Sequence, residues 1–259
     1  MIFFFDFVDA TRKWRVWSSL AKFDILKRYK RSFLGPWWIT LAMFFLILAI
    51  GILYSQLFKL DFAKYLLYLS INFAIWTLMR DSILESCQVL IDAKALLFNE
   101  KWNFLIFSFR VVYKNLIIFL HNIIIFILLA IVLVDELTLV NLLISVSALV
   151  FLILFLLPVC ILCSLINTRF RDFYMIMSNV MQLLFFLSPI LFNKQLLESY
   201  NWLLYINPLA LFILLINEPI LINEFHFNYL IYLLCYFTFF TCFTAFLFAK
   251  YKNKITYWL

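Results

Sequence analysis

The sequence predicts an all-α integral membrane protein with six transmembrane helices, an amphipathic helix on the membrane surface before them, and re-entrant helices before the last span. Hydrophobic residues make up 67% of the 259 residues and charged residues 14%, whereas about half of a soluble domain is apolar. The apolar residues form long runs, most of which approach the roughly 20 residues that cross a bilayer core as a helix. A soluble globular fold is therefore excluded.

The basic residues predict how these runs are oriented. Of the 21 Lys and Arg residues, 18 fall into four stretches that alternate with the apolar runs, at 12–31, 80–114, 169–171 and 250–254. Basic residues concentrate in cytoplasmic segments of membrane proteins, so we expect both termini in the cytoplasm. This orientation, together with attraction to membrane lipids, accounts for the net charge of +7 without nucleic-acid binding.

The first basic stretch predicts an interfacial helix over residues 10–34, because apolar side chains are interspersed among its eight basic ones. Gly35 is suited to end that helix and Pro36 to begin the next. Trp37 and Trp38 then lie at headgroup depth. The charges follow the short apolar start of the chain instead of preceding it, so no cleavable signal peptide is expected.

The apolar runs and the segments between them define the remaining elements. The six spans are predicted at residues 36–58, 62–90, 108–134, 141–166, 172–191 and 229–249. Residues 92–104 are too few to span a bilayer and predict a short cytoplasmic helix parallel to the membrane. Residues 192–228 combine aromatic residues, prolines and short apolar runs, and predict a periplasmic re-entrant region.

Two glycines in the whole chain, Gly35 and Gly51, exclude several kinds of site. A phosphate-binding P-loop and a dinucleotide-binding fingerprint each need at least two glycines at set spacing. The chain is therefore not expected to hydrolyse ATP through a site of its own. Two histidines far apart in the sequence offer no metal site, and we expect no catalytic residues, no metal and no cofactor.

Polar residues at the end of the second span are candidates for a pathway or a docking face. Asp81, Glu85, Gln88 and Asp92 recur at helical spacing and share one face if the helix continues into the cytoplasm. A solvated helix side would show the same pattern. Asn72, deeper in the span, either lines a pathway or joins helices by hydrogen bonds.

Three segments resemble one family along nearly the full length of the chain. RYKRSFLGPWWITL (Arg28–Leu41), INFAIWTLMRDSILE (Ile71–Glu85) and the pair SPI (Ser188–Ile190) and YINPL (Tyr205–Leu209) are similar to the permease subunits of ABC exporters for O-antigen, capsule and teichoic acid chains. The resemblance implies a homodimer paired with two separate nucleotide-binding ABC ATPase subunits, which bind ATP and Mg. This chain is then a transport subunit and not an enzyme.

The resemblance also implies where the functional residues lie. The substrate is an undecaprenyl-diphosphate-linked polysaccharide, exported from the cytosol to the periplasm across the bacterial inner membrane. Diphosphate oxygens accept charge-assisted hydrogen bonds from Arg and Lys. The substrate entrance is expected at Arg28, Lys30, Arg31, Leu34, Gly35 and Pro36. Pathway lining is expected at Asn72, Trp76, Arg80, Asp81 and Glu85.

The remaining implied residues lie in the two connecting regions. The coupling helix that contacts the ATPase includes Asp92, Leu96, Leu97, Phe98, Asn99 and Glu100. Many family members carry an aromatic-proline pair just after this helix, where this chain has Lys101 and Trp102. The periplasmic gate region is expected at Ser188, Pro189, Trp202, Tyr205, Asn207 and Pro208.

Three other functions stay open on the sequence. An ABC exporter of drugs or small lipids would share the same architecture. An integral-membrane transferase acting on lipid-linked substrates would use Asp81, Glu85 and Asp92 as acid, base or Mg²⁺ ligands, since carboxylates one helical turn apart can bind Mg²⁺. A structural assembly subunit would tolerate alanine at Arg28–Arg31 and at 92–104 without loss of surface glycan.

Overall fold

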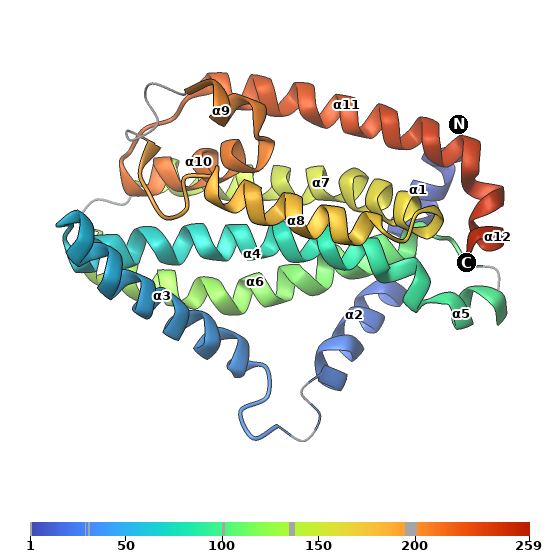
Figure 1. The fold of residues 1–259 in the computed structure, drawn as a ribbon, viewed down its shortest axis with the longest axis horizontal. Helices are drawn as coiled ribbons and strands as arrows, with labels where there is room; N and C mark the ends of the chain where they lie inside the picture. The colour runs from blue at the N-terminus through green and yellow to red at the C-terminus, as the bar shows by residue number, and fades with distance from the viewer. Residues whose placement is uncertain (1, 29, 31, 100–101, 135–137, 195–200) are drawn as a thin grey trace.

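The computed structural model describes residues 2–28, 30, 32–99, 102–134, 138–194 and 201–259. Within these ranges the chain is helical and contains no strand. Helices α1 (Ile2–Arg12), α5 (Lys94–Asn99) and α12 (Ile255–Trp258) lie at one end of the molecule together with both chain ends, as Figure 1 shows. We call this the terminal end. The α3–α4 connection and α9 lie at the opposite end, the far end.

Five helices of the described chain are long and apolar enough to cross a membrane. They are α3 (Trp37–Phe58), α4 (Phe62–Asp92), α6 (Leu105–Leu133), α7 (Leu139–Arg169) and α11 (Phe227–Tyr251). Both ends of each helix lie within a few residues of the ends of a predicted span. The expectation of an all-α, multi-pass membrane protein is confirmed at this level.

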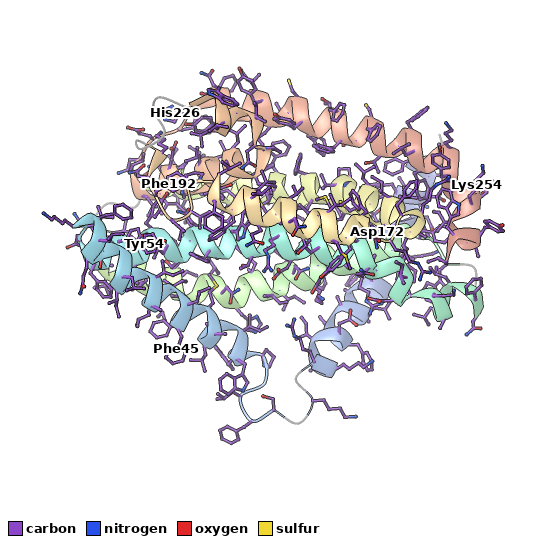
Figure 2. The ribbon with its side chains drawn as sticks, in the orientation of Figure 1. Phe45, Tyr54, Asp172, Phe192, His226 and Lys254 are labelled. Carbon is purple, nitrogen blue, oxygen red and sulfur yellow. The ribbon has the colours of Figure 1, made fainter. Side chains whose placement is uncertain are left out.

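Helices α4 and α7 form the centre of the bundle. In an apolar stretch of 18 residues in each of these two helices, 67% of the residues are buried. The corresponding share is 22% in α3 and 11% in the last spanning helix, which includes α11. Helix α4 packs on both α6 and α7, and the short helix α10 (Pro208–Leu221) packs on α7, α4 and α11. Helix α3 lies at the side of the bundle, and Phe45 projects outward from it (Figure 2). The apolar surfaces of α3 and α11 therefore face outward, as lipid-facing surfaces do.

The predicted span at 172–191 is shorter in the structure. Helix α8 (Phe173–Phe186) has 14 residues, which is about 21 Å of helix against a core of about 30 Å. The chain turns after α8 because the backbone carbonyls of the turn bond to side chains of α4. The Tyr68 hydroxyl donates to the Pro189 carbonyl at 2.6 Å, and the Tyr65 hydroxyl donates to that of Leu191 at 2.7 Å.

The described part of the region 192–228 contains α9 (Asn201–Ile206) and α10. Asn207 is the N-cap of α10, because its side-chain oxygen accepts hydrogen bonds from the backbone N–H groups of Leu209 and Ala210. The side chains of α10 from Leu209 to Ile220 are all buried. The segment predicted as a re-entrant region thus supplies a helix that is buried in the core.

The segment predicted as an interfacial helix, 10–34, contains α2 (Trp14–Arg28), and a separate helix, α1, ends at Arg12 just before it. Helix α3 begins at Trp37, and Gly35 adopts φ +56°, a conformation that glycine reaches at little cost. Figure 1 shows the end of α2 and the start of α3 projecting away from the bundle. The predicted corner at Gly35 and Pro36 therefore lies away from the core.

Candidate functional site

A group of charged side chains lies on α2, α4 and α6. Arg80 Nη1 lies 3.3 Å from Asp81 Oδ1, and Lys114 Nζ lies 2.6 Å from Glu85 Oε2. The guanidinium of Arg28, at the end of α2, acts electrostatically on the Asp81 carboxylate. We call Arg28, Arg80, Asp81, Glu85 and Lys114 the charged cluster. Its three cations and two carboxylates leave one positive charge.

The charged cluster lies at one boundary of the apolar part of the bundle. Arg80 follows the first residue of α4, Phe62, by 18 positions, which is about 27 Å along a helix. This is close to the thickness of a bilayer core of about 30 Å. The side chains of Arg80 and Asp81 remain 49% and 38% exposed, so the cluster is open to the surroundings.

Helix α2 is held beside the charged cluster by an ion pair with α6. Arg110 donates from Nε to Asp24 Oδ2 at 2.6 Å and from a second nitrogen to the other carboxylate oxygen. Such two-point arginine–carboxylate pairs hold a defined geometry. Trp17 adds aromatic contacts with Phe109 and Tyr113, at ring-centroid distances of 5.9 and 5.1 Å. These contacts hold α2, whose last residue is Arg28, against α6.

The predicted entrance residues occupy the end of α2 and the connection that follows. Arg28 and Lys30 are exposed, and Arg31 lies outside the described residues. Leu34, Gly35 and Pro36 are in the connection, beside a fully exposed Phe33 and the half-exposed Trp37 and Trp38. Among the predicted entrance residues, Arg28 is the one whose charge acts on a predicted lining residue, Asp81.

Asn72 and Trp76, the other two predicted lining residues, are in the interior of this chain. Asn72 is fully buried; its side-chain oxygen accepts from Asn217 Nδ2 at 2.6 Å, and its amide donates to the Pro189 carbonyl at 3.4 Å. Trp76 is 3% exposed and packs on Phe185. Both residues join α4 to the far-end elements instead of lining an open surface of the chain.

The predicted gate residues meet at the far end. The Asn207 amide donates to Ser188 Oγ at 2.8 Å, which links α10 to the turn after α8. Pro189 is buried in that turn, and Pro208 is the first residue of α10. The Tyr205 carbonyl accepts a hydrogen bond from the Tyr236 hydroxyl. Trp202, by contrast, is 58% exposed. Beside this turn, Tyr65, Tyr68 and Phe192 line part of a cavity of about 470 Å³.

A second charged group at the far end was missed by the sequence reasoning. Glu218 on α10 is 5% exposed, and Lys194 Nζ lies 2.6 Å from its Oε1. His226 Nε2 lies 3.0 Å from the same ammonium and 3.5 Å from Glu218 Oε2. Figure 2 shows His226 at this end of the molecule. A lone acidic residue in the apolar run PLALFILLINEPIL was the available signal, because such residues are seldom placed in apolar helices without a partner.

Helix α5 lies at the terminal end and has two exposed apolar side chains. Leu96 and Phe98 are 43% and 55% exposed, whereas Leu97 is 8% exposed and anchors the helix. Asp92, at the end of α4, and Asn99, at the end of α5, are exposed, and Glu100 lies outside the described residues. Among the described coupling residues, Leu96 and Phe98 therefore point outward and Leu97 packs inward. The polar residues Asp92 and Asn99 are exposed beside them.

The described residues offer no group of three or more His, Cys, Asp or Glu side chains that could hold a metal ion. Asp81 is paired with Arg80, and Glu85 accepts from Asn115 Nδ2 at 2.9 Å in addition to its ion pair with Lys114. The face of α4 that the sequence marked as acidic is thus largely neutralised by neighbouring cations.

No protein-family model matches the chain, and no curated protein matches it either.

Proposed function

We propose that this chain is the membrane-spanning permease subunit of an ATP-driven exporter of lipid-linked polysaccharide, of the O-antigen or capsule type. It acts as a homodimer with two separate nucleotide-binding subunits in the bacterial inner membrane. The terminal end faces the cytosol and the far end faces the periplasm. The substrate is an undecaprenyl-diphosphate-linked glycan.

Helix α5 is the observation that carries this proposal. Beyond the apolar part of the bundle, six residues form a separate helix with one buried leucine and two outward apolar side chains. Exposed apolar side chains on a membrane protein's aqueous end favour a protein partner. The chain has too few glycines for a phosphate-binding loop of its own. A separate ATPase engaging α5 supplies the energy source that the chain lacks.

The charged cluster supports the substrate class. A lipid-linked glycan presents a diphosphate at the boundary between its apolar tail and its sugars, and the cluster lies at such a boundary with a net positive charge. Arg28, Arg80 and Lys114 offer N–H donors to phosphate oxygens. Arg28 connects the cluster to the exposed corner before α3, where the headgroup would enter from the cytosolic leaflet.

The competing transferase function needs Asp81, Glu85 and Asp92 to act together. Glu85 is already bonded to Lys114 and Asn115. Asp92 lies seven residues further along α4, which is about 10 Å of helix from Glu85. A site for one Mg²⁺ requires its oxygen ligands within about 2.1 Å of the ion. The geometry of these three carboxylates therefore favours the exporter.

Affinity purification of the chain from native membranes in mild detergent tests the proposal. We expect a nucleotide-binding subunit with a Walker sequence to accompany the chain at one to one, and the complex to hydrolyse ATP. A lone chain that hydrolyses no ATP but converts a lipid-linked substrate would overturn the proposal in favour of the membrane enzyme.

Reversing the charges of Arg28, Lys30 and Arg31 to Glu tests the entrance. We expect export of surface glycan to fall about tenfold or more, because several charge-assisted hydrogen bonds to the diphosphate are lost. Membrane insertion and ATPase binding should stay intact. Reversal of Arg15, Lys22 and Lys27, three exposed cations of the same helix, is the matched control. Equal export by both triple variants would count against an electrostatic entrance.

A further inference from the structure

The last residues of the chain fold back on the bundle at the terminal end. After α11, a 3₁₀ turn (Lys252–Lys254) leads into α12. Ile255 is fully buried and Leu259 is 7% exposed. The Trp258 ring lies under the guanidinium of Arg169, the last residue of α7, at 5.0 Å. Apolar burial and a cation–π contact therefore hold this segment against α7.

This C-terminal segment is bonded to the start of α5. The ammonium of Lys94, the first residue of α5, donates to the backbone carbonyl of Leu259. The same ammonium lies 5.6 Å from the ring of Phe98, one of the two outward apolar side chains. One residue, Ala93, separates α5 from α4. The direction in which α5 leaves the bundle is therefore constrained by Lys94.

The residues that follow α5 are bonded to the other end of the chain. Asn103 Nδ2 lies 2.7 Å from the Asp6 carbonyl oxygen and 3.0 Å from Asp9 Oδ2, both on α1. Hydrogen bonds from Asn103 and Lys13 hold the pKa of Asp9 below its usual value. The Lys252 ammonium lies 2.5 Å from Asp6 Oδ2. Asp6 is thus contacted both by the segment after α5 and by the segment after α11.

We infer that α1 and the C-terminal segment hold α5 between them, and that Lys94 and Asn103 are the positioning residues through which movement of α5 is passed to the spanning helices. This inference rests on the proposed function of α5. Leu97 alone anchors α5 by apolar burial, and a single anchor leaves a six-residue helix free to pivot. Bonds on both sides of the helix remove that freedom, so a push from the partner reaches α4, α7 and α11.

The variant Lys94→Met tests this role. It keeps the length of the side chain and both outward apolar residues while removing the donor to Leu259. The partner ATPase should bind as in the wild type, and the glycan exported per ATP hydrolysed should fall about tenfold, the effect expected for loss of a hydrogen bond from a charged group. Lys254→Met removes an equal charge from the C-terminal segment and is the matched control; its export per ATP should not change.

A distance measurement tests the position of α5 without reference to transport. Spin labels at Asn99→Cys and Asn253→Cys, both exposed, report the separation of α5 from the C-terminal segment in a background lacking the exposed Cys235 and Cys242. With Lys94→Met, the ratio of molecules at the wild-type distance to molecules at other distances should fall about tenfold. With Lys254→Met, the distance distribution should be that of the wild type.

Asn103→Asp examines the other side of α5. It keeps the side-chain oxygen that accepts from the Leu105 N–H at 3.0 Å, and it replaces the donor to Asp6 and Asp9 by a carboxylate. We expect the same fall in export per ATP with normal ATPase binding.

The outcomes separate this inference from the proposed function. An unchanged label distance in Lys94→Met would overturn the positioning role, and a changed distance with normal export per ATP would overturn its link to transport. Absence of any ATPase from the wild-type preparation would overturn the proposed function and the link to transport together. The label distance would then still decide whether Lys94 positions α5.

Discussion

Replacing Leu96 and Phe98 together by Asp is expected to remove the nucleotide-binding subunit from the purified complex and to abolish export. The two side chains are the outward apolar residues of α5, and each contributes roughly 1.5–3 kcal/mol when fully buried against a partner. Aspartate loses that contribution and adds the cost of burying a charge. Together these effects predict a loss of affinity of about a hundredfold or more.

Leu97 is left unchanged in this variant. It is 8% exposed and packs against the bundle, so an aspartate there would disturb the fold and confuse loss of docking with loss of structure. Asn253→Asp with Thr256→Asp, two exposed positions at the same end, adds the same charge away from α5. The amount of ATPase that co-purifies with each variant measures whether docking is lost. Retention of the ATPase by the Leu96 and Phe98 variant would place the docking surface elsewhere.

Lys194→Met is expected to lower the free energy of unfolding by about 3 kcal/mol or more, because it leaves the Glu218 carboxylate buried without its nearest cation. The Lys194 side chain is 22% exposed and that of Glu218 6%, with 2.6 Å between the charged atoms. The pair joins the segment after α8 to the end of α10, so its loss should also loosen the far end. Thermal unfolding in one detergent at neutral pH measures the effect.

The double variant Lys194→Met with Glu218→Gln is the informative comparison. Removing both charges avoids the cost of an isolated buried carboxylate, so most of the lost stability should return. Lys64→Met, at an exposed lysine of the same end, controls for loss of a positive charge and should unfold like the wild type. A Lys194→Met protein that is as stable as the wild type would mean that water or His226 already compensates Glu218.

Several features of the fold were predictable because they depend on local properties of the chain. Hydrophobicity over about 20 residues identifies a helix that can cross a bilayer, and the five long helices lie where the apolar runs predict them. Gly35 was identified as a corner and has positive φ. The short helix between the second and third spans was predicted from its length and mixed composition and is α5.

The features that were not predictable depend on contacts between distant residues. The run 172–191 is apolar enough for a span, yet α8 ends at Phe186 because Tyr65 and Tyr68 of α4 bond to the carbonyls of the turn that follows. The sequence predicts re-entrant helices in the region that contains α10, but hydropathy describes this run without its neighbours. The packing of α10 against α4 and α7 is what places it in the core.

The sequence by itself determined that the chain is a helical membrane protein, which runs approach spanning length, and which polar residues interrupt them, since these follow from composition and spacing. Tertiary structure alone decided which polar residues meet. Asn72 bonds to Asn217 across 145 positions, and Arg110 bonds to Asp24 across 86. Hydropathy describes one segment at a time, whereas a buried polar group is stabilised by a partner that any distant segment can supply.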